Sequence, residues 1–119
     1  MAKHNELGKK GEELAKKMLI EKGYDILETN WRFDKDEIDI IAKDGDELVI
    51  VEVKTRSTDI FGYPEDAVNS KKEFFLIRAT ESYLVENNIN VDTRFDIVAI
   101  IHNNNETKIH HIIDAFYPE

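Results

Sequence analysis

The chain has 119 residues, 41% of them hydrophobic and 34% charged, and it contains no cysteine. This length accommodates one small core, so we expect residues 1–119 to form a single domain. The lack of cysteine excludes disulfide bonds and thiolate metal sites, and no apolar stretch approaches the roughly 18 residues of a membrane-spanning helix. Because the first residues carry no apolar export signal, we expect a cytoplasmic protein without a membrane partner.

The formal net charge of −9 counts against a nucleic-acid partner, because nucleic acids are bound largely through Lys and Arg contacts to phosphate. The cations are clustered, however: several lysines lie near the start, Lys54 lies close to Arg56, and Lys71 adjoins Lys72. Carboxylates that hold a metal ion would also be neutralised in use. The acidic balance therefore leaves nucleic-acid binding open.

Residues 5–22 have the pattern of an amphipathic helix, with one stripe of small and apolar side chains at the spacing of 3.6 residues per turn. The stripe consists of Leu7, Gly11, Leu14, Ala15, Met18 and Leu19. Gly23 follows as a natural end of the helix.

Glu12 lies at the edge of this stripe, so we expect its carboxylate to reach the sheet, whereas Glu13 is rotated among the lysines. Gly8 and Gly11 weaken an isolated helix. Close approach of the helix backbone to the sheet or to a substrate would explain these glycines, and fraying at the N-terminus explains them nearly as well.

Runs rich in β-branched residues predict five strands around a second helix. The expected strands are 24–33, 37–43, 47–54, 94–102 and 107–116. Ser70 begins a capping box that predicts a helix continuing to about Asn87. The order α-β-β-β-α-β-β places a helical crossover between the third and fourth strands, so we expect an α/β fold whose mixed central sheet is flanked by helices.

Asp44-Gly45 is typical of a two-residue hairpin turn with positive φ at both positions. With these residues in the loop, Glu37 lies opposite Glu52, and Asp39 is a diagonal neighbour of Glu52. One face of the hairpin would carry Glu37, Asp39, Ile41, Leu48, Ile50, Glu52 and Lys54. The other face would carry Ile38, Ile40, Ala42, Val49, Val51 and Val53. Since both faces are mostly apolar, we expect a central hairpin covered on both sides.

Three carboxylates, Glu37, Asp39 and Glu52, converge in this arrangement and are candidate catalytic residues. Anions that meet in a partly buried place need a counter-charge or a metal ion, and oxygen ligands suit Mg²⁺ or Mn²⁺. Lys54 points to the same place and could hold a phosphate or orient a water. A Glu and a Lys two residues apart on a strand often form only a solvated salt bridge. The position of Glu52 in a central strand favours a functional site over that interpretation.

Motifs spread over nearly the whole chain resemble one known family. They are Gly8-x-x-Gly11-Glu12-x-x-Ala15, Asn30-Trp31-Arg32, Glu37-Ile38-Asp39, Val51-Glu52-Val53-Lys54-Thr55-Arg56 and Arg94-x-Asp96-Ile97-Val98. In combination they resemble the YraN family, also called UPF0102. That family is similar to the PD-(D/E)XK nucleases, which have a restriction-endonuclease-like core, and among them to the archaeal Holliday junction resolvases. The resemblance implies a Mg²⁺-dependent endonuclease acting on DNA, including branched or structured DNA, and by analogy a homodimer.

The resemblance also implies roles for individual residues. Asp39, Glu52 and Lys54 would form the catalytic core, with Glu12 as a carboxylate from the helix. The metal ligands would be Asp39, Glu52, the backbone carbonyl of Val53 and Glu12, the last directly or through water. Arg56, Lys71 and Lys72 would contact the phosphate backbone. The chain has Asp36 where family members usually have Gly, which puts the local turn in doubt, whereas Ile38 before the catalytic Asp is usual in the family.

Two other functions stay open: a catalytically silent module that binds nucleic acid or a protein, and a small-molecule phosphoesterase. The net charge favours the module, and the intact set of Asp39, Glu52 and Lys54 favours an enzyme.

The remaining polar and aromatic signals predict less. His110 and His111 are adjacent on a strand and point to opposite faces, so we expect ordinary surface or edge residues. For Asp96 we expect a structural role. The apolar segment 61–63 could stack on a base or cover the metal, and packing within the loop is at least as well supported.

Overall fold

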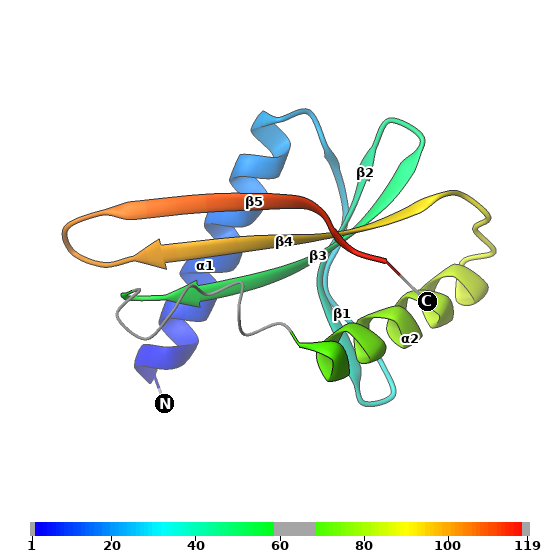
Figure 1. Ribbon diagram of the computed structural model, residues 1–119, viewed down its shortest axis with the longest axis horizontal. Coiled ribbons are helices and arrows are strands. Elements are labelled where there is room, and N and C mark those ends of the chain that lie inside the picture. Colours follow the sequence, from blue (N-terminus) through cyan, green and yellow to red (C-terminus); the bar gives the residue numbers. More distant parts are fainter. Residues whose placement is uncertain (1, 59–68, 118–119) are drawn as a thin grey trace.

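The computed structural model describes residues 2–58 and 69–117 (Figure 1). The elements within these ranges are α1 (Ala2–Glu21), β1 (Asp25–Phe33), β2 (Asp36–Asp44), β3 (Glu47–Arg56), α2 (Ser70–Glu86), β4 (Thr93–His102) and β5 (Thr107–Phe116). This order confirms the expected α-β-β-β-α-β-β arrangement. The expected loop after Lys54 begins later because β3 continues through Arg56, and the segment 61–63 lies outside the described residues.

The strands form one sheet in the order β1-β2-β3-β4-β5, so β3 occupies the middle. Strands β3 and β4 are parallel, and the other neighbouring pairs are antiparallel. The mixed sheet follows from the chain order, because α2 carries the chain from the end of β3 back to the start of β4. Among the described helices, none is both long and apolar enough to cross a membrane.

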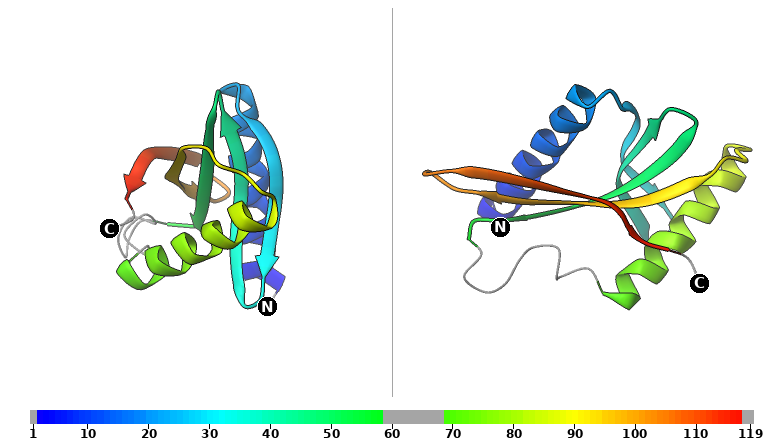
Figure 2. Two further views of the ribbon diagram at one scale, coloured as in Figure 1. Left: turned by 90° about the vertical axis from the view of Figure 1, so that its right-hand side faces the viewer. Right: turned by 45° about the horizontal axis from the view of Figure 1, so that its top comes forward.

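Helix α1 covers one face of the sheet, and α2 covers the other (Figure 2). The core on the α1 side consists of Ala15, Leu19, Tyr24, Ile40, Ala42, Val49, Val51, Val98 and Ile100. The core on the α2 side consists of Ile38, Ile41, Leu48, Ile50, Leu76, Ala79, Tyr83, Phe95 and Phe116. The central hairpin is therefore covered on both sides, as its two apolar faces predict.

Gly11 lies where α1 is in close contact with Thr55 of β3. A Cβ atom at this position would lie 2.8 Å from Thr55 Cβ and would overlap the Thr55 hydroxyl, so only glycine fits. A Cβ at Gly8, by contrast, would meet nothing within 4 Å. Close approach to the sheet thus explains Gly11 but not Gly8. The same close contact brings the next residue, Glu12, near the sheet.

The N-cap of helix α2 lies one residue before the predicted one. Asn69, not Ser70, is the N-cap, and its side chain accepts a 3.1 Å hydrogen bond from the backbone N–H of Lys72. Asn is as favourable as Ser at this position, because its side-chain oxygen satisfies the same free amide. The helix therefore starts with Lys71 and Lys72 in its first turn.

The hairpin between β2 and β3 has Gly45 and Asp46 in its loop, and Asp44 pairs with Glu47. Gly45 has a φ of 63°, as in a type II′ turn, which needs positive φ only at its first loop position. The predicted register is therefore wrong by two residues. Because side chains alternate with a period of two, a two-residue shift leaves each side chain on its predicted face.

Ile38 is an exception to that alternation. It is fully buried in the core that α2 covers, beside Ile41, although the pattern predicts that it shares a face with Ile40 on the α1 side. The alternation of side chains along β2 is thus interrupted at Asp39, which lies between Ile38 and Ile40.

Candidate active site

The antiparallel ladder between β2 and β3 ends at the pair Ile40–Val51, one residue short of Asp39 and Glu52. Strand β3 stays paired with β4 to its last residue. Beyond the end of the β2–β3 ladder, the backbone N–H of Val53 donates a 2.8 Å hydrogen bond to Asp39 Oδ2. The Asp39 side chain therefore satisfies a backbone group of β3 and is held against that strand.

The β1 side of Asp39 is irregular as well. Strand β1 pairs with β2 at Thr29–Ile40 and at Trp31–Ile38. Between these pairs, Asn30 has a φ of 52°, which a regular strand residue does not adopt. Asp39 thus lies beyond the end of the β2–β3 ladder and next to the irregular backbone of Asn30 in β1.

The register of the hairpin, extended by one pair, sets Asp39 directly opposite Glu52, and a hydrogen bond joins the two carboxyl groups. Only 5% of Glu52 is exposed. Burial raises the pKa of Asp39 to about 8, and the adjacent charge of Glu52 acts in the same direction. Two carboxyl groups so placed do not both ionise freely, so the pair retains a proton near neutral pH unless a cation replaces it.

A cation from α2 faces this pair. Lys72 Nζ lies 3.2 Å from Glu52 Oε2, and 44% of the Lys72 side chain is exposed against 7% of the Glu52 side chain. The ammonium group therefore stays hydrated while it balances a carboxylate that is almost shielded from water. The expected phosphate-binding residue Lys72 is thus brought to the carboxylate pair.

Lys54 and Arg56 follow Glu52 on the same face of β3, because unbroken pairing with β4 keeps the alternation regular. Both side chains are partly buried. Lys54 forms no ion pair with another residue of the described ranges. Within the same ranges, Arg56 Nε is buried without a hydrogen-bond partner. Strand β3 thus lines up one carboxylate and two cations along one side.

Glu12 reaches the sheet from α1, as predicted. It lines a cleft of about 320 Å³ that also contains Asn30 and Asp39. Burial raises the pKa of Glu12, the charge of Asp39 raises it further, and a hydrogen bond from Asn30 acts in the opposite direction. The protonation of Glu12 is therefore coupled to the charge of Asp39.

The carboxylates do not form a complete metal cage by themselves. No three His, Asp or Glu side chains in the described part of the chain come close enough together to hold an ion. Asp39 and Glu52 supply two adjacent carboxyl groups, and Glu12 stands farther away across the cleft.

Glu37 does not lie opposite Glu52, and the predicted pairing of these residues is wrong because the ladder ends before it. Glu37 pairs with Arg32 of β1, with 3.6 Å between Glu37 Oε2 and Arg32 Nη2. Lys71 is exposed in the first turn of α2, and its Nζ lies 5.9 Å from the centre of the Phe75 ring. Neither residue contacts the Asp39–Glu52 pair directly.

Comparison with known proteins identifies the family. The sequence model of uncharacterised protein family UPF0102 matches residues 11–100, a range that includes Glu12, Asp39, Glu52, Lys54 and Lys72. The chain belongs to the UPF0102 family. It is 56% identical to a UPF0102 protein of Christiangramia forsetii over 98% of both chains. It is 52% identical to UPF0102 protein FP2501 of Flavobacterium psychrophilum, again over 98% of both chains. A UPF0102 protein of Thermodesulfovibrio yellowstonii is 48% identical over 94% of this chain and 96% of its own.

An ion pair that the sequence analysis missed lies beside the site of this UPF0102 protein. Asp36, at the start of β2, accepts two hydrogen bonds of 2.7 and 2.6 Å from Arg78 of α2. The hydrogen bonds from Arg78 lower the pKa of Asp36. This two-point contact fastens the β1–β2 turn to α2 and gives Asp36 a structural role.

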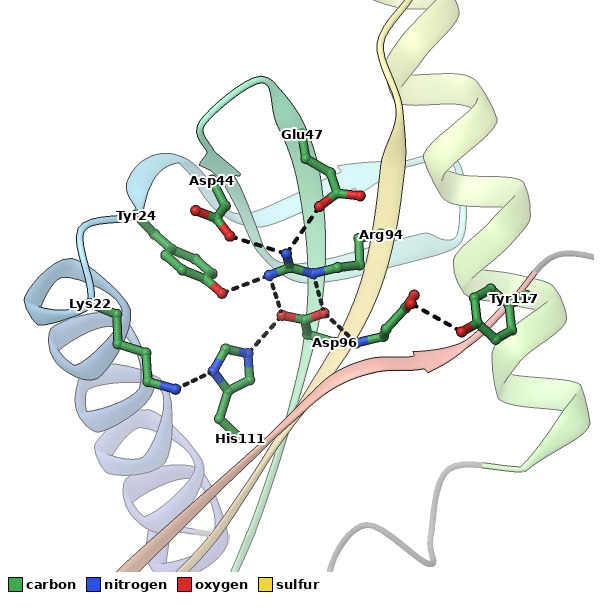
Figure 3. A network of polar contacts seen from close by, with 9 residues as sticks. Lys22, Tyr24, Asp44, Glu47, Arg94, Asp96, His111 and Tyr117 are labelled. Atoms are coloured by element: carbon green, nitrogen blue, oxygen red, sulfur yellow. Dashed lines mark hydrogen bonds and ion pairs between the residues drawn. The ribbon is translucent and has the colours of Figure 1, made fainter.

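A second polar cluster is centred on Asp96 of β4 (Figure 3). Arg94 donates two hydrogen bonds of 2.9 Å to its carboxylate, and Asp114 donates one of 3.0 Å through its backbone N–H. His111 Nε2 lies 2.7 Å from Asp96 Oδ2, while Lys22 Nζ lies 2.9 Å from His111 Nδ1. Burial opposes ionisation of Asp96, but the hydrogen bonds from His111 and Arg94 outweigh it and lower the pKa.

Arg94 extends the same cluster to the hairpin. Its Nη1 lies 3.1 Å from both Asp44 and Glu47, and its Nη2 lies 2.6 Å from the hydroxyl of Tyr24. These contacts tie β2, β3 and β4 together at the hairpin end of the sheet, which agrees with a structural role for Asp96.

His111 lies on the edge strand β5, as expected for a surface or edge residue, but only 3% of its side chain is exposed. The spacing of Arg94 and Asp96 on one face of a buried strand could have indicated an internal ion pair. No local signal in the sequence indicates the contribution of His111.

Proposed function

We propose that this UPF0102 protein is a metal-dependent nuclease that hydrolyses phosphodiester bonds in DNA, including branched or structured DNA. One observation carries the proposal: the partly buried carboxyl group of Asp39 and the buried carboxyl group of Glu52 meet at the end of the β2–β3 ladder, beside Lys72. The resemblance of the motifs to PD-(D/E)XK nucleases supports the same function. The fold alone would not, because one fold serves many functions.

The chemistry of the donor atoms fits a hard divalent cation. Without one, burial keeps a proton on the Asp39–Glu52 pair, and Mg²⁺ or Mn²⁺ would replace that proton. The proposed ligands are Asp39, Glu52 and the backbone carbonyl of Val53. Glu12 stands across the cleft, so a contribution through water suits its position. When bound, such an ion activates a water molecule and polarises the phosphoryl group.

The cations of the site then act on the substrate. Lys54, on the same face as Glu52, would position the attacking water and balance the charge that develops on the phosphate. Lys72, whose side chain is 44% exposed while it pairs with Glu52, would contact a phosphate oxygen. Arg56 and Lys71 would contact phosphates on either side.

The test uses labelled single-stranded, duplex, flap and four-way-junction DNA with Mn²⁺, and a chromogenic phosphomonoester as a small-molecule substrate. We expect DNA cleavage that falls at least about hundredfold in Glu52→Gln and Lys54→Met. Glu81→Gln, an exposed substitution on α2, is the matched control and should retain activity. Hydrolysis of the phosphomonoester alone would instead indicate a small-molecule phosphoesterase.

A catalytically silent DNA- or protein-binding module is the second candidate. The ion pair of Lys72 with Glu52 favours it, because a carboxylate that is already balanced needs no metal ion. DNA binding that is unchanged in EDTA, with no cleavage of any substrate in Mn²⁺, would establish that alternative. Light scattering on the same samples tests the expected homodimer.

A further inference from the structure

Two aromatic rings stand at the surface of α2 next to the candidate active site. Phe74 is 59% exposed, and its ring meets that of Phe75 edge to face, with 5.9 Å between the centres. An exposed aromatic side chain gains no free energy from burial in the folded protein. A cluster of such side chains beside a site therefore indicates a binding surface.

Cations surround these rings. The guanidinium carbon of Arg78 lies 5.6 Å from the centre of the Phe74 ring and 5.0 Å from that of Phe75, and Lys71 Nζ lies 5.9 Å from the Phe75 centre. Asp36 holds Arg78 through two hydrogen bonds. This contact fixes the guanidinium plane and neutralises it, so Arg78 supports the rings rather than attracting phosphate.

The aromatic cluster is continuous with the candidate active site. Phe75 and Arg78 line a hollow of about 360 Å³ together with Lys72 and Glu37, and Lys72 contacts Glu52. A chain lying over the Phe75 ring would therefore meet Lys72, the residue that contacts Glu52.

We propose that this α2 face, formed by Lys71, Lys72, Phe74, Phe75 and Arg78, binds single-stranded DNA. Bases would stack on the Phe74 and Phe75 rings, while Lys71 and Lys72 contact the flanking phosphates. This inference rests on the proposed nuclease function for the adjoining site, and it specifies a single strand, or a strand splayed from a duplex, as the substrate.

The charge of the molecule selects between single and double strands. A protein with a net charge of −9 is repelled by any nucleic acid, and more strongly by a duplex, because its two strands double the density of phosphates. Stacking on an aromatic ring does not depend on net charge and tolerates any base, since every base has a flat apolar face. A small contact that relies on two rings and two lysines therefore suits a single strand.

The test measures fluorescence anisotropy of labelled oligothymidine and of a hairpin duplex with the same number of phosphates, both in EDTA so that no cleavage occurs. We expect tighter binding of the single strand. Phe74→Ala should weaken it by about five- to a hundredfold without changing the salt dependence. Lys71→Gln should reduce the salt dependence, because one phosphate contact is lost.

Val85→Ala is the matched control, because Val85 is 81% exposed farther along the same helix. It should bind like the wild type. Equal binding of duplex and single strand would overturn the proposal, as would unchanged affinity in Phe74→Ala. A dimer that Phe74→Ala dissociates in light scattering would overturn it too, by making the rings a contact between two copies of the chain.

The outcomes separate this inference from the proposed nuclease function. Single-strand binding that depends on Phe74, with no cleavage in Mn²⁺, would support the α2 face as a binding site and contradict the proposed nuclease function. Metal-dependent cleavage of both single-stranded and duplex DNA that Phe74→Ala leaves unchanged would support the nuclease function and contradict the proposed binding by the α2 face. Because Phe74 is exposed, Phe74→Ala should fold, and circular dichroism checks this; Phe75→Leu, which keeps an apolar side chain but loses the ring, is the second variant.

Discussion

The backbone N–H of Val53 lies 2.8 Å from Asp39 Oδ2, at the point where β2 and β3 stop pairing. One side chain thus satisfies a strand amide and also brings a carboxyl group against Glu52. A site built in this way depends on the backbone of the central strand, and rigid strands position such groups more accurately than loops do. Four predictions follow from these contacts and from those of the helix and the Asp96 cluster.

The first prediction concerns the stability of the metal-free protein against pH. The folded-state pKa of Asp39, about 8, is far above its usual value of 3.8, so between these values the folded state binds more protons than the unfolded state. Stability therefore falls as pH rises from about 4 to 8, by at most about 1.4 kcal/mol per pH unit. Chemical denaturation in EDTA at several pH values measures this slope.

Asp39→Asn is the matched variant, because an amide oxygen can still accept the hydrogen bond from Val53 but carries no charge. Its stability should be nearly flat across the same pH range and should exceed that of the wild type at pH 8. Parallel slopes in the two proteins would show that Asp39 is not the group responsible.

The second prediction concerns the fit of α1 onto the sheet. Gly11→Ala places a methyl group against Thr55, so we expect a loss of roughly 1–3 kcal/mol in the free energy of unfolding, as for other overpacked contacts. Gly8→Ala meets open space and should gain about 0.5–1 kcal/mol from helix propensity. Thermal unfolding of both variants gives the comparison. If Gly11→Ala stabilised the protein as Gly8→Ala does, the close contact would be refuted.

The third prediction concerns the buried Asp96 cluster. Asp96→Asn leaves Arg94 without its main counter-charge, and removing one partner from a buried ion pair costs about 3–5 kcal/mol. Glu106→Gln, which breaks the exposed pair with Lys108, should cost less than about 1 kcal/mol. Urea denaturation at pH 7 distinguishes the two, and a mild effect of Asp96→Asn would contradict a structural role.

The fourth prediction concerns acid. Because the hydrogen bonds to Asp96 outweigh burial and lower its pKa, the stability that this carboxylate contributes is present above its usual pKa near 3.8. It is lost as pH falls through the lower folded-state value. The Asp96 and Asp39 contributions thus have opposite signs, and the difference between wild type and Asp96→Asn should shrink below about pH 4. A difference that stays constant down to pH 2 would count against the assignment.

The sequence predicted the order of elements because each follows from a local pattern of apolar residues or from a turn. The predicted hairpin register was wrong, because Asp44-Gly45-Asp46 contains two possible two-residue loops and the chain uses the second. The error equals one full period of a strand, so the predicted proximity of Asp39 and Glu52 was preserved.

Other features depend on contacts that no local pattern contains. The break in β2 at Asp39, beyond which Ile38 lies on the α2 side, coincides with the end of the β2–β3 ladder. The burial of His111 follows from Asp96, which lies 15 positions earlier in the chain. Arg78 meets Asp36 across 42 positions, and neither residue has a spacing that suggests the other.

The most direct test of the Asp39–Glu52 pair is calorimetric titration of the protein with Mn²⁺ at pH 7, in two buffers that differ in their enthalpy of ionisation. If a cation replaces the proton on this pair, the wild type binds Mn²⁺ and releases close to one proton per ion, whereas Asp39→Asn binds far more weakly and releases none. Equal Mn²⁺ affinity in the two proteins, or binding by the wild type without proton release, would contradict the account.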